Sequence, residues 1–250
     1  MRSTIRNIPR WALLVITTLG AAWIIASSLV YFDVSRIAPF MIEKLPLRFE
    51  ALWLFSLRVH VAAAMVSLPL CIALMTRPVQ RRPRAHRWLG RLAGLVIVFA
   101  LVPSGFVLSL EAKGGLFGTL GFMLSGAIVA FCMISGALAA RRRDMPAHKR
   151  MMSHVFAQMS VAVSSRIMLV GFAALEIDHD SVYLISLWVP VLASAVLAEL
   201  TSSSPRSLIE RSRRAASSIV FWVSRCLGLR LVDRLGGSTV ARGEGSAARG

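Results

Sequence analysis

The chain has 250 residues, of which 56% are hydrophobic and only 16% are charged. A soluble domain is usually about a quarter charged and of this size could not bury so much apolar surface, so the composition excludes a simple water-soluble fold. The net charge of +17 lies in short basic clusters between long apolar runs. This pattern is typical of membrane topology, and we expect no nucleic-acid partner.

Six apolar runs are long enough to cross a bilayer, which takes about 20 residues per helix. We therefore predict an all-α fold, a polytopic transmembrane helical bundle over residues 11–200. The spans are expected near residues 11–32, 51–76, 92–110, 114–140, 151–175 and 181–200.

The first apolar run has some features of a signal peptide, because arginines precede it and residues 26–28 would suit a cleavage site. Its apolar stretch is longer than the roughly 7–15 residues of a signal-peptide core. We expect an uncleaved anchor, preceded by a short cytoplasmic segment, residues 1–10.

The basic residues predict the orientation. Of the 29 Lys and Arg residues, 23 lie on one side of the predicted membrane and four on the other, with Arg58 and Arg166 inside spans. The positive-inside rule then places both termini in the cytoplasm. We expect a multi-pass protein of the bacterial cytoplasmic (inner) membrane, whose basic segments contact anionic lipids at the cytoplasmic face.

The segment after the last span changes character. Residues 201–235 mix apolar residues with arginines, which predicts a basic amphipathic helix on the inner leaflet. A seventh span through residues 219–232 is the alternative, but that run is short and contains Arg225 and Arg230. Residues 236–250 are rich in Gly, Ser, Ala and Arg and are predicted to be disordered.

Ionisable residues inside a span cost roughly 2.5–3.5 kcal/mol at the helix centre and suggest a functional site. His60 and Arg166 are both expected about 14 Å from the outer surface, where the spans offer no Asp or Glu. Arg166 could pair with backbone carbonyls, water, or an anionic or oxygen-bearing ligand such as a haem propionate, a quinone or a lipid phosphate. Arg58 could instead extend outward to water. His60 could be a haem ligand, a proton carrier or a histidine bonded to a backbone carbonyl.

His86 and His148 each precede an apolar run at the inner face. They could belong to an interfacial basic cluster that holds lipid headgroups, with Trp88 as an anchor. Alternatively, they could meet across the bundle and bind a metal or haem. Further along the fifth span, His154 and Gln158 share a polar stripe that is expected to face protein rather than lipid.

These residues resemble a family of predicted bacterial membrane proteins whose common domain has no known function. The resemblance rests on His60, the segment 86–91 (HRWLGR), the segment 148–152 (HKRMM) and Arg166, and it covers roughly residues 52–175. It implies that His60, His86, His148 and Arg166 form the polar signature. Met151-Met152 stands where the family usually has Trp-Met. The layout is also distantly similar to that of b-type cytochromes.

Three functional hypotheses follow. The chain could bind haem b or quinone through His60, His86, His148 and Arg166; it could be a small anion or proton transporter; or it could be a non-catalytic assembly or lipid-binding protein. The motifs of soluble enzymes are missing from the sequence, so we predict no catalytic residue and favour a protein that is not an enzyme. The three cysteines form no CxxC pair, and the sequence determines neither a metal nor a cofactor.

Overall fold

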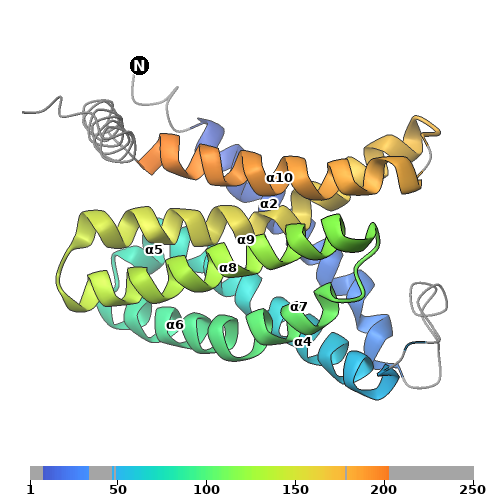
Figure 1. Ribbon diagram of the computed structural model, residues 1–250. Helices are drawn as coiled ribbons and strands as arrows, with labels where there is room; N and C mark the ends of the chain where they lie inside the picture. The colour runs from blue at the N-terminus through green and yellow to red at the C-terminus, as the bar shows by residue number, and fades with distance from the viewer. Residues whose placement is uncertain (1–7, 34–46, 48, 178, 203–250) are drawn as a thin grey trace, which may run out of the picture. The chain divides into compact units, whose positions relative to one another are not determined.

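The computed structural model describes residues 8–33, 47, 49–177 and 179–202, and every regular element in this part of the chain is helical. The predicted interfacial segment 201–235 lies outside the described residues from residue 203 onward. The predicted tail 236–250 and residues 1–7 also lie outside them. The elements, shown in Figure 1, are α2 (Ile8–Ser28), η1 (Leu29–Phe32), α4 (Glu50–Met75), α5 (Arg77–Gln80), α6 (Pro83–Val96), η2 (Ile97–Leu101), α7 (Val102–Ser109), α8 (Gly115–Arg141), α9 (Met145–Ala174) and α10 (His179–Ser202).

The predicted all-helical fold with six spans is confirmed. Within the described part of the chain, six helical segments are long and apolar enough to cross a membrane, and the protein is a multi-pass membrane protein. These segments are Ala12–Phe32, Glu50–Met75, Pro83–Ser109, Gly115–Arg141, Met145–Ala174 and Val182–Ser202.

Two spans begin earlier than the apolar runs indicate. The third begins at Pro83 rather than near residue 92, and the fifth begins at Met145 rather than near residue 151. Both helices extend beyond the apolar run through a basic first turn, where the charged side chains can remain in water. Asp144 caps the fifth span, because its Oδ1 accepts a hydrogen bond from the Ala147 amide at 3.0 Å.

Four spans form the centre of the bundle. The span α6–η2–α7 packs against α4 and α8, and α8 packs against α9. The helix α10 lies along α9, and α2 contacts α4 and α9 (Figure 1). The apolar core lies among the central helices, where Ile97, Val129 and Val155 are almost completely buried.

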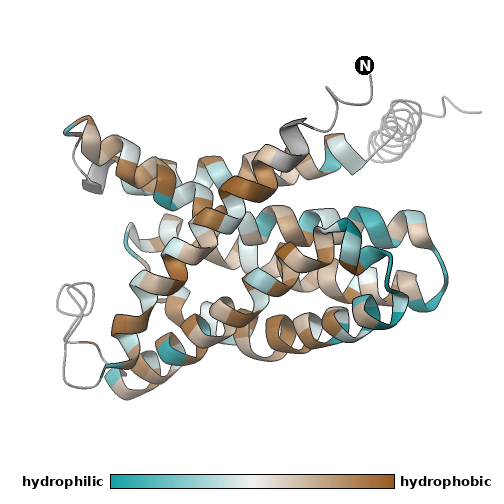
Figure 2. Ribbon diagram, turned by 180° about the vertical axis from the view of Figure 1, so that it is seen from behind, coloured by the Kyte–Doolittle hydropathy of each residue, from teal (hydrophilic) through white to brown (hydrophobic). Residues whose placement is uncertain are grey.

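The bundle has two chemically different ends. We call the end that carries residues 76–82 and 142–144 the basic end, and the end that carries residues 110–114 and 175–177 the opposite end. Figure 2 shows hydrophilic residues gathered around the α8–α9 connection, whereas the helix surfaces between the two ends are largely apolar. Large apolar side chains such as Phe99 and Phe131 are exposed there, as expected for lipid contact. The positive-inside rule predicts that the basic end faces the cytoplasm.

The third span is irregular near Pro103. Its backbone widens into the π-helical turn η2 immediately before α7. Proline has no amide hydrogen, and its ring conflicts with the carbonyl one turn earlier, so a normal α-helix cannot continue unchanged through it. The turn η2 also shifts the backbone carbonyls of the third span. It therefore changes which of them lie within reach of side chains on α4.

Candidate functional site

His86 and His148 face one another at the basic end. His86 lies in the first turn of α6, and His148 lies in the first turn of α9. Their ring centres are 6.4 Å apart, and their ring planes are nearly perpendicular, at 87°. The helices α6 and α9 pack mainly against other helices, but each places one imidazole at the basic end of the bundle, where the two rings meet.

The ring of His148 is fixed by the neighbouring helix. Its Nδ1 lies 2.9 Å from the carbonyl oxygen of Gly136 on α8. Since a carbonyl can only accept a hydrogen bond, Nδ1 carries the hydrogen and donates it. Nε2 is then the ring nitrogen left to bind something else, and this carbonyl-anchored arrangement is the usual one for a metal-bound histidine.

His86 lacks such an anchor. Its Nδ1 is buried and has no hydrogen-bond partner among the described residues. A buried polar atom left unpaired costs about 1–3 kcal/mol, so this nitrogen is a natural position for a ligand.

The helix α6 has an open position one turn after His86. Gly90 lies one turn further along α6, about 40° around the helix from His86. A Cβ atom placed on Gly90 would meet no other atom within 4 Å. Ala93 and Ile97, on the same side of the helix, are fully buried. The surface of α6 is therefore open at Gly90, whereas the helix is packed at Ala93 and Ile97.

Three arginines are exposed on α6, the helix that carries His86. Arg84, Arg87 and Arg91 are exposed on α6, and Arg91 lies over the ring of Trp88 at 5.7 Å. These guanidinium groups are suited to carboxylates or phosphates.

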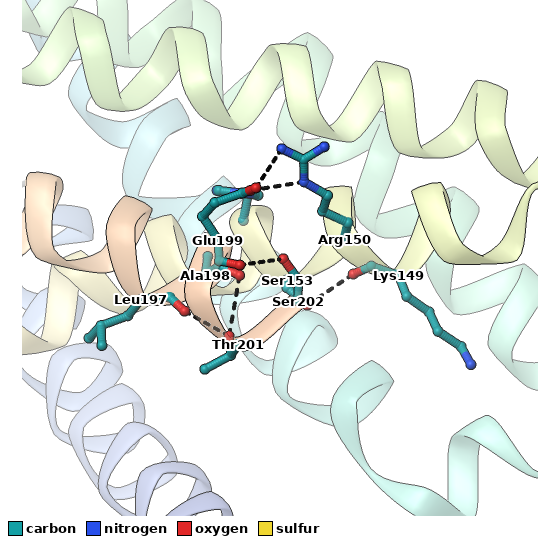
Figure 3. A network of polar contacts seen from close by, with 9 residues as sticks. Lys149, Arg150, Ser153, Leu197, Ala198, Glu199, Thr201 and Ser202 are labelled. Carbon is teal, nitrogen blue, oxygen red and sulfur yellow. Dashed lines mark hydrogen bonds and ion pairs between the residues drawn. The ribbon is translucent and has the colours of Figure 1, made fainter. Parts of the chain in front are cut away.

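A second polar group joins α9 to α10 at the same end. Arg150 donates two hydrogen bonds of 2.8 Å to the Glu199 carboxylate, and His154 Nε2 lies 3.1 Å from it. Figure 3 shows Arg150 and Glu199 pointing toward one another. Glu199 therefore has its own partners on α9, and we assign this group to helix packing.

Gln158 is 3% exposed and links three helices. Its Nε2 donates to the Val191 carbonyl and to Ser194 Oγ, both at 3.0 Å, and its Oε1 accepts from Ser125 Oγ at 2.9 Å. The polar stripe on α9 thus faces protein at Gln158, and the amide of Gln158 is fully used in holding α8 and α10.

His60 lies in the other half of the bundle. Its Nδ1 is 3.0 Å from the Leu101 carbonyl in η2 and 3.3 Å from Ser104 Oγ. A Cβ atom on Gly105 would lie 3.1 Å from His60 Cε1, so the ring fits tightly against α7. His60 is thus a histidine bonded to a backbone carbonyl. His86 lies about 20 Å away along the α6–α7 span.

Arg166 shares the half of the bundle that contains His60. Its Nη1 donates to the Ala162 carbonyl at 3.0 Å, and its side chain is exposed. Tyr31 on η1 and Tyr183 near the start of α10 lie toward the same end of the bundle as Arg166. The two tyrosines were missed in the sequence, because an aromatic residue near a span end carries no signal beyond that of an interfacial anchor.

The four predicted site residues therefore fall into two groups, His86 with His148 and His60 with Arg166. Within the described residues, no group of three or more His, Cys, Asp or Glu side chains could hold a metal ion. A metal at the histidine pair would need most of its ligands from elsewhere.

Comparison with known proteins gives one family. Neither a curated protein nor a solved structure matches the chain. Residues 57–202, more than half of the chain and including all four residues of the two groups, match the family of predicted membrane proteins DUF2306, to which this protein belongs.

Proposed function

We propose that this protein binds haem b through His86 and His148 at the basic end of the bundle and acts as a membrane electron carrier. The separation of the two rings carries the proposal. Two iron–nitrogen bonds of about 2.0 Å, with about 1.1 Å from each nitrogen to its ring centre, would separate the ring centres of two histidines that hold one iron by about 6.2 Å. The ring centres of His86 and His148 are 6.4 Å apart.

The small number of protein ligands favours haem over a bare metal ion. A structural zinc ion takes four protein ligands and a catalytic zinc ion usually takes three. The described residues provide two histidines at this point and no group of three. A haem brings nitrogen ligands of its own, so His86 and His148 would be the two residues that hold it.

The surroundings also fit a haem. His86 would hold the iron through its unpaired Nδ1, and His148 would hold it through Nε2, because the Gly136 carbonyl occupies the Nδ1 of His148. The open space at Gly90 suits a flat ligand beside α6. Arg87 and Arg91 would bind the propionates at the membrane surface.

When bound, haem would supply one-electron chemistry. In this account the histidines hold and orient the group, while Ala93 and Ile97 exclude water from the side toward the core. Electron transfer is therefore the activity that this arrangement supports.

The test is an absorption spectrum of the full-length protein purified in detergent from haem-supplemented cells. We expect a Soret band, and we expect it to be lost or greatly reduced in His86→Ala and His148→Ala. His154→Ala is the matched control, because His154 lies on the same helix as His148 but contacts Glu199. A colourless wild-type protein, or variants that keep the full band, would overturn the proposal.

A further inference from the structure

The helix α6 carries its arginines and its buried side chains on opposite sides. Arg84 and Arg91 lie about 20° from one another around the helix axis, and both are exposed. Ala93, which is fully buried, lies about 180° around the helix from Arg84. The side of α6 that carries Arg84 and Arg91 therefore faces away from the bundle.

An aromatic side chain and two apolar ones continue this outward side. Trp88 lies about 40° around the helix from Arg84 and is 70% exposed, and the Arg91 guanidinium lies 5.7 Å from its ring centre. Leu95 lies about 20° from Arg84 and is 57% exposed. Phe99, in the following turn η2, is 74% exposed. We call Arg84, Trp88, Arg91, Leu95 and Phe99 the outer face of α6.

The outer face of α6 changes from charged to apolar with depth. Trp88 lies about 6 Å further along the helix than Arg84, and Leu95 lies about 16 Å further along. Tryptophan is typical of the membrane interface, and exposed apolar side chains deeper in a span contact acyl chains. This order of cation, aromatic ring and apolar side chains matches the order of phosphate, glycerol backbone and acyl chain in a phospholipid.

The charges at the start of α6 favour an anion. Arg84 and Arg87 are among its first five residues, at the positive end of the helix dipole, where a further positive charge is unfavourable. The first turn has no acidic residue, and no carboxylate in the described part of the chain forms an ion pair with Arg84, Arg87 or Arg91. Arg150 on α9, by contrast, pairs with Glu199 at 2.8 Å. An anion from outside the chain would offset both the dipole and the repulsion between the arginines of α6.

We propose that the outer face of α6 binds an anionic phospholipid of the phosphatidylglycerol class. Arg91 leans toward the N-terminus of its helix and therefore toward Arg84, so that both guanidinium groups can donate hydrogen bonds to one phosphate. Trp88 would lie beside the glycerol backbone, and an acyl chain would lie along Leu95 and Phe99. Phosphatidylcholine carries a cation in its headgroup that the arginines repel, so the site prefers a headgroup with net negative charge.

This lipid site lies on a different side of α6 from the proposed haem site. Arg84 and Trp88 each lie about 160° around the helix from His86. Arg91 borders both proposed sites, so the test is built on Arg84, which the haem proposal does not use. Lipid binding at the outer face of α6 requires no haem, and the two proposals can therefore fail independently.

The test is native mass spectrometry of the full-length protein in detergent, titrated with phosphatidylglycerol or with phosphatidylcholine. A bound haem would add its own mass, so lipid affinity is measured separately on each form of the protein. We expect the wild type to bind its first phosphatidylglycerol at least about tenfold more tightly than its first phosphatidylcholine, since each arginine near an anionic headgroup contributes about fivefold. Arg84→Gln should weaken phosphatidylglycerol binding about fivefold and leave phosphatidylcholine binding unchanged. Arg84→Lys should keep most of the affinity, because the charge is retained.

Arg141→Gln is the matched control, because Arg141 is exposed at the same end of the bundle but lies in the last turn of α8. Its affinity for phosphatidylglycerol should stay within about twofold of the wild type. Equal affinity of the wild type for the two lipids would overturn the proposal. An equal loss in Arg84→Gln and Arg141→Gln would also overturn it, because the lipid would then respond to the overall positive charge. Displacement of the lipid by glycerol phosphate at a comparable concentration would assign the arginines to a free anion and overturn the lipid site.

Discussion

Arg150 and Glu199 join α9 to α10 through two parallel hydrogen bonds, Nε to Oε2 and Nη2 to Oε1, each 2.8 Å long. The two side chains are 30% and 28% exposed, so water screens them only partly. The fork-shaped guanidinium matches the carboxylate in direction as well as in charge. This pair (Figure 3) fixes the last span at the basic end. His154 Nε2 lies 3.1 Å from the same carboxylate.

We expect Glu199→Gln to destabilise the protein by about 1 kcal/mol, since the amide keeps one acceptor but loses the charge. The measurement is the thermal unfolding midpoint in detergent. Combining Glu199→Gln with Arg150→Met should cost less than the sum of the two single changes, because both remove the same interaction. Strict additivity would show that the pair contributes nothing.

Gln158→Leu should loosen α8 and α10 from α9. Three hydrogen bonds to Ser125, Val191 and Ser194 are lost, and hydrogen bonds between membrane helices contribute about 0.6 kcal/mol each on average, so a total near 2 kcal/mol is expected. Unfolding in sodium dodecyl sulfate would measure it. Because Gln158 has no role in the haem site, the absorption spectrum should be unchanged. A loss of ion or proton flux in liposomes with stability intact would favour the transporter hypothesis instead.

Gly136→Ala should lower haem occupancy without removing either histidine. A Cβ atom at Gly136 would lie 3.0 Å from Met151 Cβ and would clash with Met152 Cε. The flexible Met152 can move, but Met151 can give way only if α9 shifts. That shift would disturb the Gly136 carbonyl that holds His148. The measurement is the ratio of Soret to protein absorbance.

Gly171→Ala is the control for this change, because it lies on α9 and its added Cβ would meet no atom within 4 Å. It should keep the wild-type ratio. If the wild type, Gly136→Ala and Gly171→Ala all had the same ratio of Soret to protein absorbance, the geometry at Gly136 would not affect haem binding.

The orientation can be tested with reporter fusions in the connections. A fluorescent-protein fusion after Arg143 should fluoresce, and an alkaline-phosphatase fusion after Lys113 should be active, because the 23 basic residues of the predicted inner side belong in the cytoplasm. The reverse pattern at both points would contradict the predicted topology.

Much of the fold could be predicted from the sequence, because a membrane span must be long and apolar. The starts of α6 and α9 could not be predicted from apolar runs, since a helix continues into water wherever its backbone hydrogen bonds are made. Pro83 and the Asp144 cap were the available signals.

Less of the candidate site could be predicted from the sequence. The depth of His60 and Arg166 follows from counting residues along a helix, but the direction of a side chain depends on which end its helix begins at. Whether His86 and His148 meet depends on how α6 and α9 are rotated, which core packing decides. The π-turn η2 and the Leu101 carbonyl that it presents to His60 had only Pro103 as a signal.

Electron paramagnetic resonance of the oxidised protein at low temperature tests the central proposal most directly. Two axial histidines with ring planes at 87° predict a low-spin ferric signal with a strongly shifted largest g value, which is characteristic of perpendicular imidazoles. This signal should vanish in His86→Ala and in His148→Ala and persist in His154→Ala. A high-spin signal from the wild type, or no haem signal at all, would contradict the assignment of His86 and His148 as a haem-binding pair.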